Sequence, residues 1–256
     1  MKLLLIDAGN TKLKWCCEDT ASQELVARGA DGYVGAADAI ITAINQKVGK
    51  PDKVGISCVK SIPFKVELVD AVSRVWGITP FVASVESVAH GIRCSYEDPA
   101  RMGVDRWLAM IAVRYRFRGC FCVVDSGSAT TFDWVSSNGE HLGGFIVAGL
   151  RLSISALLAG TDQVIVDYDK LSGADPLPGK STTDAVYHGA LFSCLSQVKE
   201  AYQYLLSVQD TGEVRMVLAG GDAQLLSSHL TEIPHEIASD LVFEGLKVML
   251  DLKEGR

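Results

Sequence analysis

The same short pattern occurs twice in this sequence, once near the N-terminus and once near the middle. The apolar residues 3–6 end in Asp7 and a turn of small residues, and the apolar residues 122–124 end in Asp125 and a similar turn. Alternating apolar and polar residues follow both turns, which is typical of a strand, a tight turn and a second strand. The repetition predicts two halves, each of which begins with the same acidic hairpin.

Each of these turns carries a glycine two residues after its aspartate, Gly9 in the first and Gly127 in the second. Backbone N–H groups in such a turn can bind phosphate oxygens, and the aspartate can hold a cation that offsets the phosphate charge. For either turn alone, an ordinary connection between strands is the commoner reading. Two copies that begin equal halves favour a ligand site instead, because clefts between repeated halves are frequent binding sites.

The hydrophobic periodicity predicts three strands at the start of each half, followed by alternating helices and strands. In the first half we expect helices over residues 36–48 and from residue 63 to 76, and strands over 53–59 and 79–83. In the second half we expect strands over 121–125, 131–135, 144–147 and 214–219, and helices over 150–158, 183–206, 222–229 and 240–252. A chain of 256 residues suits two modest domains, which we place at residues 1–118 and 119–256.

Composition limits the partners and the compartment. A net charge of -7 gives no electrostatic footprint for nucleic acid or for an anionic membrane, so we expect a small-molecule partner. The apolar run before Asp7 is too short for a signal peptide or a membrane span, which predicts a cytoplasmic protein. The seven cysteines are odd in number and form no C-x-x-C pair, and we expect them to be reduced and structural.

Two glycine-containing segments remain. Gly220 and Gly221 follow the predicted strand 214–219 and would let a flat group approach the backbone closely, although a plain turn explains them equally well. Residues 173–181 look like a P-loop, but five residues rather than four separate the two glycines. Pro176 and Pro178 also lack the N–H groups that a phosphate cradle needs, so we exclude a P-loop.

A further pair of charges lies at Asp105 and Arg106, near the start of a predicted helix. Asp98 and Pro99 suit the N-cap and first turn of this helix. Asp105 could simply interact with the helix dipole and Arg106 with solvent. Alternatively, the carboxylate accepts a hydroxyl proton and the guanidinium binds an anionic substrate. The expected apolar face of the helix comprises Leu108, Ile111, Ala112 and Tyr115.

The other titratable side chains give weaker signals. Lys12 and Lys14 alternate with the apolar face of a strand, so we expect solvated charges, one of which could reach a phosphate. His188 lies close in sequence to Thr182 and could approach a substrate. Surface or capping positions are expected for His90, His141, His229 and His235.

Together the two aspartate turns and the diglycine have the order found in the actin, hexokinase and Hsp70 superfamily. More specifically, the chain resembles type III pantothenate kinase. The matching segments are Asp7-Ala8-Gly9-Asn10-Thr11, Tyr96 with Gly103-Val104-Asp105-Arg106, residues 125–131, and Gly179-Lys180-Ser181-Thr182. The resemblance implies an α/β fold with two similar ribonuclease H-like (actin-like ATPase) domains. Each would be a mixed five-stranded sheet flanked by helices, with an interdomain cleft.

The resemblance also implies an activity, which is ATP-dependent phosphorylation of pantothenate to 4'-phosphopantothenate in the first step of coenzyme A biosynthesis. The implied ATP-binding residues are Asp7, Ala8, Gly9, Asn10, Thr11, Lys12, Leu13, Lys14 and Ser128. The implied pantothenate-binding residues are Tyr96, Gly103, Val104, Asp105, Arg106 and Thr182, with Asp105 as the proton acceptor. Asp125 would ligate a monovalent cation, potassium or ammonium, and Mg²⁺ would accompany ATP. The family works as a homodimer with the site near the subunit interface.

Three residues depart from the family's usual pattern. Ser128 replaces a threonine, Ala148 a proline and Ser181 an asparagine, and none of these changes removes a charged catalytic group. Two other functions stay open. One is a nucleotide-binding regulator that has lost the transfer chemistry, and the other is a different small-molecule kinase or ATPase on the same fold.

Overall fold

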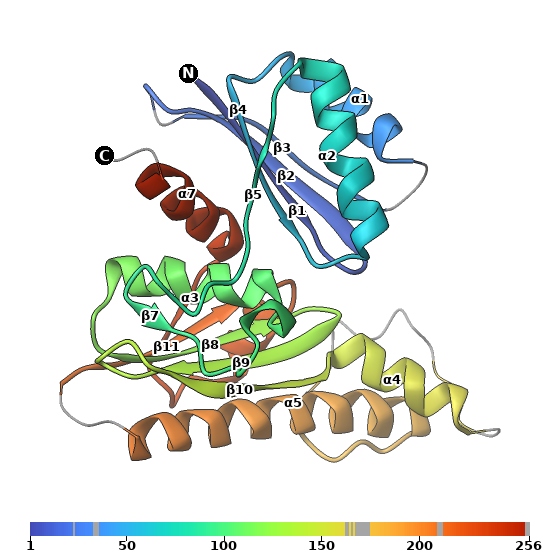
Figure 1. Ribbon diagram of the computed structural model, residues 1–256. Helices are drawn as coiled ribbons and strands as arrows, with labels where there is room; N and C mark the ends of the chain where they lie inside the picture. The colour runs from blue at the N-terminus through green and yellow to red at the C-terminus, as the bar shows by residue number, and fades with distance from the viewer. Residues whose placement is uncertain are drawn as a thin grey trace. The chain divides into compact units, whose positions relative to one another are not determined.

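The computed structural model of this protein describes residues 1–22, 24–32, 36–161, 164, 166, 175–208 and 212–253. It divides into two compact units, which we call unit 1 (Met1–Arg116 with Asp240–Arg256) and unit 2 (Phe117–Ser239). Each unit contains a five-stranded mixed sheet with flanking helices (Figure 1).

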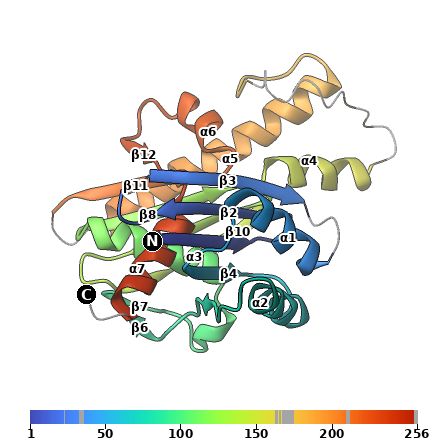
Figure 2. The same cartoon turned by 90° about the horizontal axis from the view of Figure 1, so that it is seen from above.

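The sheet of unit 1 has the strand order β3-β2-β1-β4-β5 (Figure 2). Its antiparallel strands are β1 (Lys2–Ala8), β2 (Lys12–Asp19) and β3 (Glu24–Gly32), and β4 (Lys53–Cys58) and β5 (Phe81–Val82) extend the sheet in parallel from β1. The remaining elements are α1 (Ala37–Val48), α2 (Ile62–Trp76), β6 (Val88–Ala89), β7 (Ile92–Arg93), the 3-10 turn η1 (Pro99–Arg101), α3 (Val104–Arg116) and α7 (Leu241–Lys253).

Helices cover both faces of the unit 1 sheet. Side chains along a strand alternate between the two faces, so each strand contributes to both packed layers. Leu4 and Ile6 of β1 pack with α1 and α2 in one core cluster. On the other face α7 packs against β1 and β4, and a Cβ on Gly55 would lie 2.8 Å from Leu250. Each such buried leucine or isoleucine stabilises the fold by roughly 1.5–3 kcal/mol.

Unit 2 repeats this plan with the strand order β10-β9-β8-β11-β12. Its antiparallel strands are β8 (Cys120–Ser126), β9 (Ala129–Val135) and β10 (His141–Ala148), and its parallel strands are β11 (Val214–Ala219) and β12 (His235–Ile237). The helices are α4 (Leu150–Ala159), α5 (Thr182–Ser207) and α6 (Ala223–His229). The first strand of each sheet ends at one of the two aspartate turns, so the repeated fold predicted from the sequence is confirmed.

Three details differ from the sequence-based expectations. The segment 240–252 was expected in the second half, but α7 packs on α3, β1 and β4 and belongs to unit 1. Asp98 does not cap α3, because its Oδ1 accepts the Ala100 N–H at 3.1 Å and so caps η1. Tyr115 is 65% exposed and is not part of the buried face of α3.

Two further expectations concern a membrane-spanning helix and the P-loop-like segment. None of the helices in the described ranges is long and apolar enough to cross a membrane. Gly173 and Ala174 of the P-loop-like segment lie outside the described residues.

Candidate functional site

The β1–β2 turn of unit 1 presents a small set of polar groups. Asp7 at the end of β1 is nearly buried, and its Oδ1 accepts a hydrogen bond from Ser57 Oγ at 3.0 Å. The Gly9 N–H donates to Lys12 O at 3.1 Å and closes the turn. Asn10 and Thr11 are exposed at its tip. The turn therefore has a fixed base and an accessible tip.

The predicted ATP-binding residues of this turn differ in what they can offer a ligand. Lys12 and Lys14 are exposed. Ala8 and Leu13 are completely buried in the core of unit 1, so their side chains hold the hairpin and only their backbone groups can meet a ligand.

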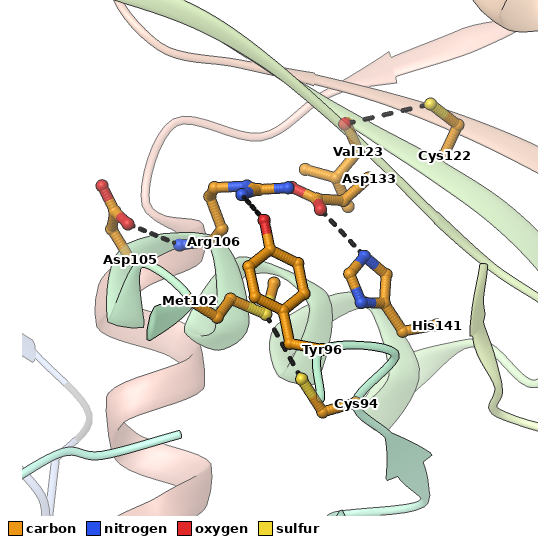
Figure 3. A network of polar contacts seen from close by, with 9 residues as sticks. All are labelled: Cys94, Tyr96, Met102, Asp105, Arg106, Cys122, Val123, Asp133 and His141. Carbon is orange, nitrogen blue, oxygen red and sulfur yellow. Dashed lines mark hydrogen bonds and ion pairs between the residues drawn. The ribbon is translucent and has the colours of Figure 1, made fainter. Parts of the chain in front are cut away.

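A second polar cluster in unit 1 is built around Arg106. This charged side chain is buried, with 6% exposure, and its Nη1 donates to Tyr96 Oη at 2.9 Å (Figure 3). The Arg106 guanidinium carbon also lies 5.9 Å from the centre of the Tyr96 ring. The phenol thus fixes a guanidinium, which is the group best suited to bind a carboxylate in two-point fashion.

Asp105 lies beside this arginine at the start of α3. Its Oδ1 accepts the Arg106 N–H at 2.8 Å, and the carboxylate is half-buried (Figure 3). A Cβ on Gly103 would stand 2.6 Å from the same oxygen. The side chain of Val104 is buried, so this residue can reach a ligand only through its backbone. The first turn of α3 thus carries a half-buried carboxylate and, on the next residue, a guanidinium fixed by Tyr96.

The β8–β9 turn of unit 2 is the counterpart of the β1–β2 turn. Asp125 at the end of β8 is half-buried, and Ser128 is exposed at the tip. The Gly127 N–H donates to Ala129 O at 3.0 Å. Beneath the turn, the buried hydroxyls of Ser126 and Thr130 lie 3.1 Å apart. This arrangement again leaves a rigid base below an accessible tip.

Two segments distant in sequence pack closely on this second turn. Gly220 has a φ of +87°, and a Cβ there would lie 2.2 Å from Ser126 O and 2.4 Å from Asp125 Oδ1. A Cβ on Gly149 would lie 2.0 Å from Gly127 O. Gly220 of the diglycine therefore packs against Asp125, which its separate position in the sequence did not establish.

The structure adds a carboxylate that the sequence reasoning missed. The Asp222 N–H donates to Ser126 O at 3.1 Å, so this residue is tied to the β8–β9 turn. Burial raises the pKa of Asp222, and the positive charge of Arg151 on α4 opposes that shift. The signal available in the sequence was its position directly after the diglycine.

Thr182 lies at the exposed first position of α5, whose N-cap is Ser181. The Ser181 hydroxyl accepts the Asp184 N–H at 3.1 Å. A Cβ on Gly179 would lie 2.3 Å from the backbone nitrogen of Ala185, so the chain before the helix must be glycine at that position. His188 Nδ1 lies 2.8 Å from Leu177 O and fixes the same segment. Among the described hydrogen bonds none joins Thr182 to the β8–β9 turn.

The expectation of a surface or capping role for His141 is wrong. His141 is buried in unit 2, and its Nε2 lies 3.0 Å from Oδ1 of the equally buried Asp133 on the neighbouring strand (Figure 3). Two polar residues are accommodated in this sheet because each satisfies the other.

The acidic groups fit a cation that is held mainly by substrate. No group of three or more histidine, cysteine, aspartate or glutamate side chains that could hold a metal ion occurs within the described parts of the chain. Mg²⁺ in phosphate-transfer sites typically uses only one or two carboxylates, with phosphate and water as its other ligands. Asp7, at the base of the β1–β2 turn, fits this donor set.

Unit 2 also carries an apolar cavity of about 600 Å³ between β9, β10 and α5. Trp134 lies at its base, with ring centres 5.4 Å from Phe145 and 5.2 Å from Tyr204. Phe145 is 66% exposed and Phe192 59%. Two exposed aromatic rings beside an apolar cavity make this face a candidate interaction surface.

Comparison with known proteins places these features in context. Residues 3–204 match the family model described as type III pantothenate kinase. A type III pantothenate kinase from Chromohalobacter salexigens is 38% identical over 254 residues, which cover 96% of this chain and 86% of the relative.

Two solved structures share the fold. A protein from Campylobacter jejuni assigned to the Baf family of transcriptional activators has a TM-score of 0.64 and 18% identity, covering 99% of this chain and 100% of that chain. A ROK family glucokinase from Streptomyces griseus, in complex with glucose and AMPPNP, has a TM-score of 0.54 and 12% identity, covering 97% of this chain and 99% of that chain. At these identities the likeness concerns the fold.

Proposed function

This chain belongs to the type III pantothenate kinase family, which phosphorylates pantothenate in the first step of coenzyme A biosynthesis, and from this premise we propose how its residues perform the reaction. The observation that carries the proposal is the succession, at the start of α3, of the Asp105 carboxylate, which accepts the Arg106 backbone N–H, and the Arg106 guanidinium, which donates to Tyr96. ATP is the phosphoryl donor.

Asp105 accepts the proton of the primary hydroxyl of pantothenate while that oxygen attacks the γ-phosphorus of ATP. Arg106, fixed by Tyr96, binds the pantothenate carboxylate. Gly103 and Val104 shape the backbone beside this carboxylate-binding group, and Thr182 offers a hydroxyl. A general base contributes roughly 10²–10⁴-fold to the rate, and positioning and electrostatics supply the rest.

The two aspartate turns bind the nucleotide. The tip of the β1–β2 turn, with Asn10, Thr11, Lys12 and Lys14, contacts phosphate oxygens, and Ser128 contacts ATP from the β8–β9 turn. Mg²⁺ bound with ATP would neutralise phosphate charge, and the single carboxylate of Asp7 at the base of the β1–β2 turn would hold it. Asp125 would hold a monovalent cation, potassium or ammonium, and the close approach of the Gly220 backbone to its Oδ1 supports this role.

The activity and the cation are tested in one experiment. ADP formation by the wild-type protein is measured with and without pantothenate, in potassium and in sodium buffer. We expect turnover that requires pantothenate and is faster in potassium. Equal rates in the two buffers would contradict the cation assignment. A nucleotide-binding regulator would show no pantothenate-dependent turnover, and a different kinase would prefer another alcohol in a panel of hydroxylated acceptors.

We place the homodimer interface at the aromatic cavity of unit 2, supported by the exposed rings of Phe145 and Phe192. Burial of such rings against a second copy removes a large apolar area from water. The variant Phe145→Asp should sediment as a monomer at concentrations where the wild-type protein is a dimer. A dimer that survives this change would contradict the location. The requirement for ATP supports a cytoplasmic location.

A further inference from the structure

Lys60, which the sequence reasoning passed over, lies at the first nucleotide turn. We propose that Lys60 is a further phosphate-contacting residue of this chain, binding the triphosphate of the nucleotide beside the β1–β2 turn. The proposal rests on the assignment of that turn to ATP. It adds the Lys60 ammonium to the groups that contact the triphosphate.

The backbone places Lys60 next to the turn. Strand β4 runs parallel to β1, with Cys58 opposite Ala8. The Val59 N–H donates to Ala8 O at 3.1 Å, which carries the pairing one residue beyond the end of β4. Val59 is thus held against Ala8 at the start of the turn, and Lys60 is the residue that follows Val59.

The side chain then points at the tip of the turn. Lys60 Nζ lies 3.5 Å from Asn10 O, within reach of a long hydrogen bond. It also lies 5.6 Å from the centre of the Phe64 ring, and the residue is half-buried. An ammonium held by a carbonyl and an aromatic face loses less conformational freedom on binding a ligand than a fully solvated lysine does.

The groups around the Lys60 ammonium leave it able to bind a phosphate oxygen. The first turn of α2, which begins two residues after Lys60, carries no acidic residue. A lysine ammonium has three donors, so it can bind Asn10 O and a phosphate oxygen at the same time. Lys12 and Lys14 lie on β2, and both side chains are exposed.

Direct binding of inorganic tripolyphosphate, followed by calorimetry, tests the proposal without catalysis. We expect Lys60→Met to weaken binding about tenfold, equivalent to about 1.4 kcal/mol, while Lys60→Arg stays within about threefold of wild type. Lys50→Met is the matched control, because Lys50 is an exposed lysine just before the opposite end of β4, and it should bind as wild type does.

Kinetics with ATP and pantothenate provide the second readout. Lys60→Met should raise KM for ATP about tenfold and leave KM for pantothenate unchanged, and its salt dependence should be shallower because one phosphate contact is lost. Tripolyphosphate binding by Lys60→Met equal to that of wild type would overturn the proposal. If Lys60→Met does not fold, Lys60→Gln serves the same comparison. Absence of pantothenate turnover in the wild-type protein would overturn the proposed function instead, and the tripolyphosphate titration would still decide the role of Lys60.

Discussion

The carboxylate of Asp105 folds over the backbone of Gly103, so that a Cβ on Gly103 would lie 2.6 Å from Asp105 Oδ1. The glycine therefore provides the space in which the proposed base stands. Because the Arg106 N–H holds the same oxygen at 2.8 Å, a side chain at position 103 cannot be accommodated without moving the carboxylate.

We predict that Gly103→Ala lowers kcat roughly 10²-fold, since displacement of a reacting group by about 1 Å has an effect of that size. KM for ATP should change little, because the β1–β2 turn is untouched. Steady-state kinetics with both substrates check this, and circular dichroism confirms the fold. Unchanged kcat in a folded variant would show that the position of Asp105 is not critical.

Gly220→Ala should damage the second nucleotide turn. The φ of +87° and the 2.2 Å approach to Ser126 O both exclude a side chain. We expect the free energy of unfolding to fall by roughly 1–3 kcal/mol and KM for ATP to rise. Gly221→Ala is the control for stability, because a Cβ there meets nothing within 4 Å, and it should change the free energy of unfolding by less than about 0.5 kcal/mol. Equal stability of the two variants would refute the packing.

Asp222→Asn should raise stability at neutral pH. Burial raises the pKa of Asp222 above its usual 3.8, so the folded state holds this proton more tightly than the unfolded state does. Its stabilising contribution is present below the unfolded pKa and is lost as the pH rises through the folded pKa. The advantage of the variant, measured by denaturant unfolding, should therefore be full at pH 7 and disappear as the pH approaches 3.8.

Arg151→Gln provides the matching test, because the Arg151 charge opposes the shift at Asp222. Introduced into the wild-type protein, this substitution should lower the free energy of unfolding at pH 7. Introduced into Asp222→Asn, it should lower the free energy of unfolding by less. Identical effects in both backgrounds would show that the two side chains are not coupled.

Local patterns were sufficient to predict most of the fold. The aspartate turns, the strands that flank them and the helix that carries Asp105 all follow from alternation and helical periodicity. The placement of α7 does not, because its apolar residues would suit either core. Its packing against α3, β1 and β4 shows which sheet it covers.

The site was predictable only where its residues are contiguous in sequence. The Tyr96–Arg106 bond lies within one short segment, and the resemblance to the family included both residues. The contact of Gly220 with Asp125, the position of Lys60 beside Asn10, and the buried His141–Asp133 pair each join segments that periodicity treats separately. Strand pairing and packing decide such contacts, and a single sequence does not report them.

The turnover of Asp105→Asn, with ATP binding measured in parallel by calorimetry, tests the central claim most directly. We predict that pantothenate-dependent ADP formation falls by roughly 10²–10⁴-fold while the Kd for ATP stays within about threefold of wild type. Near-wild-type turnover in this variant would contradict the role of Asp105 as the proton acceptor.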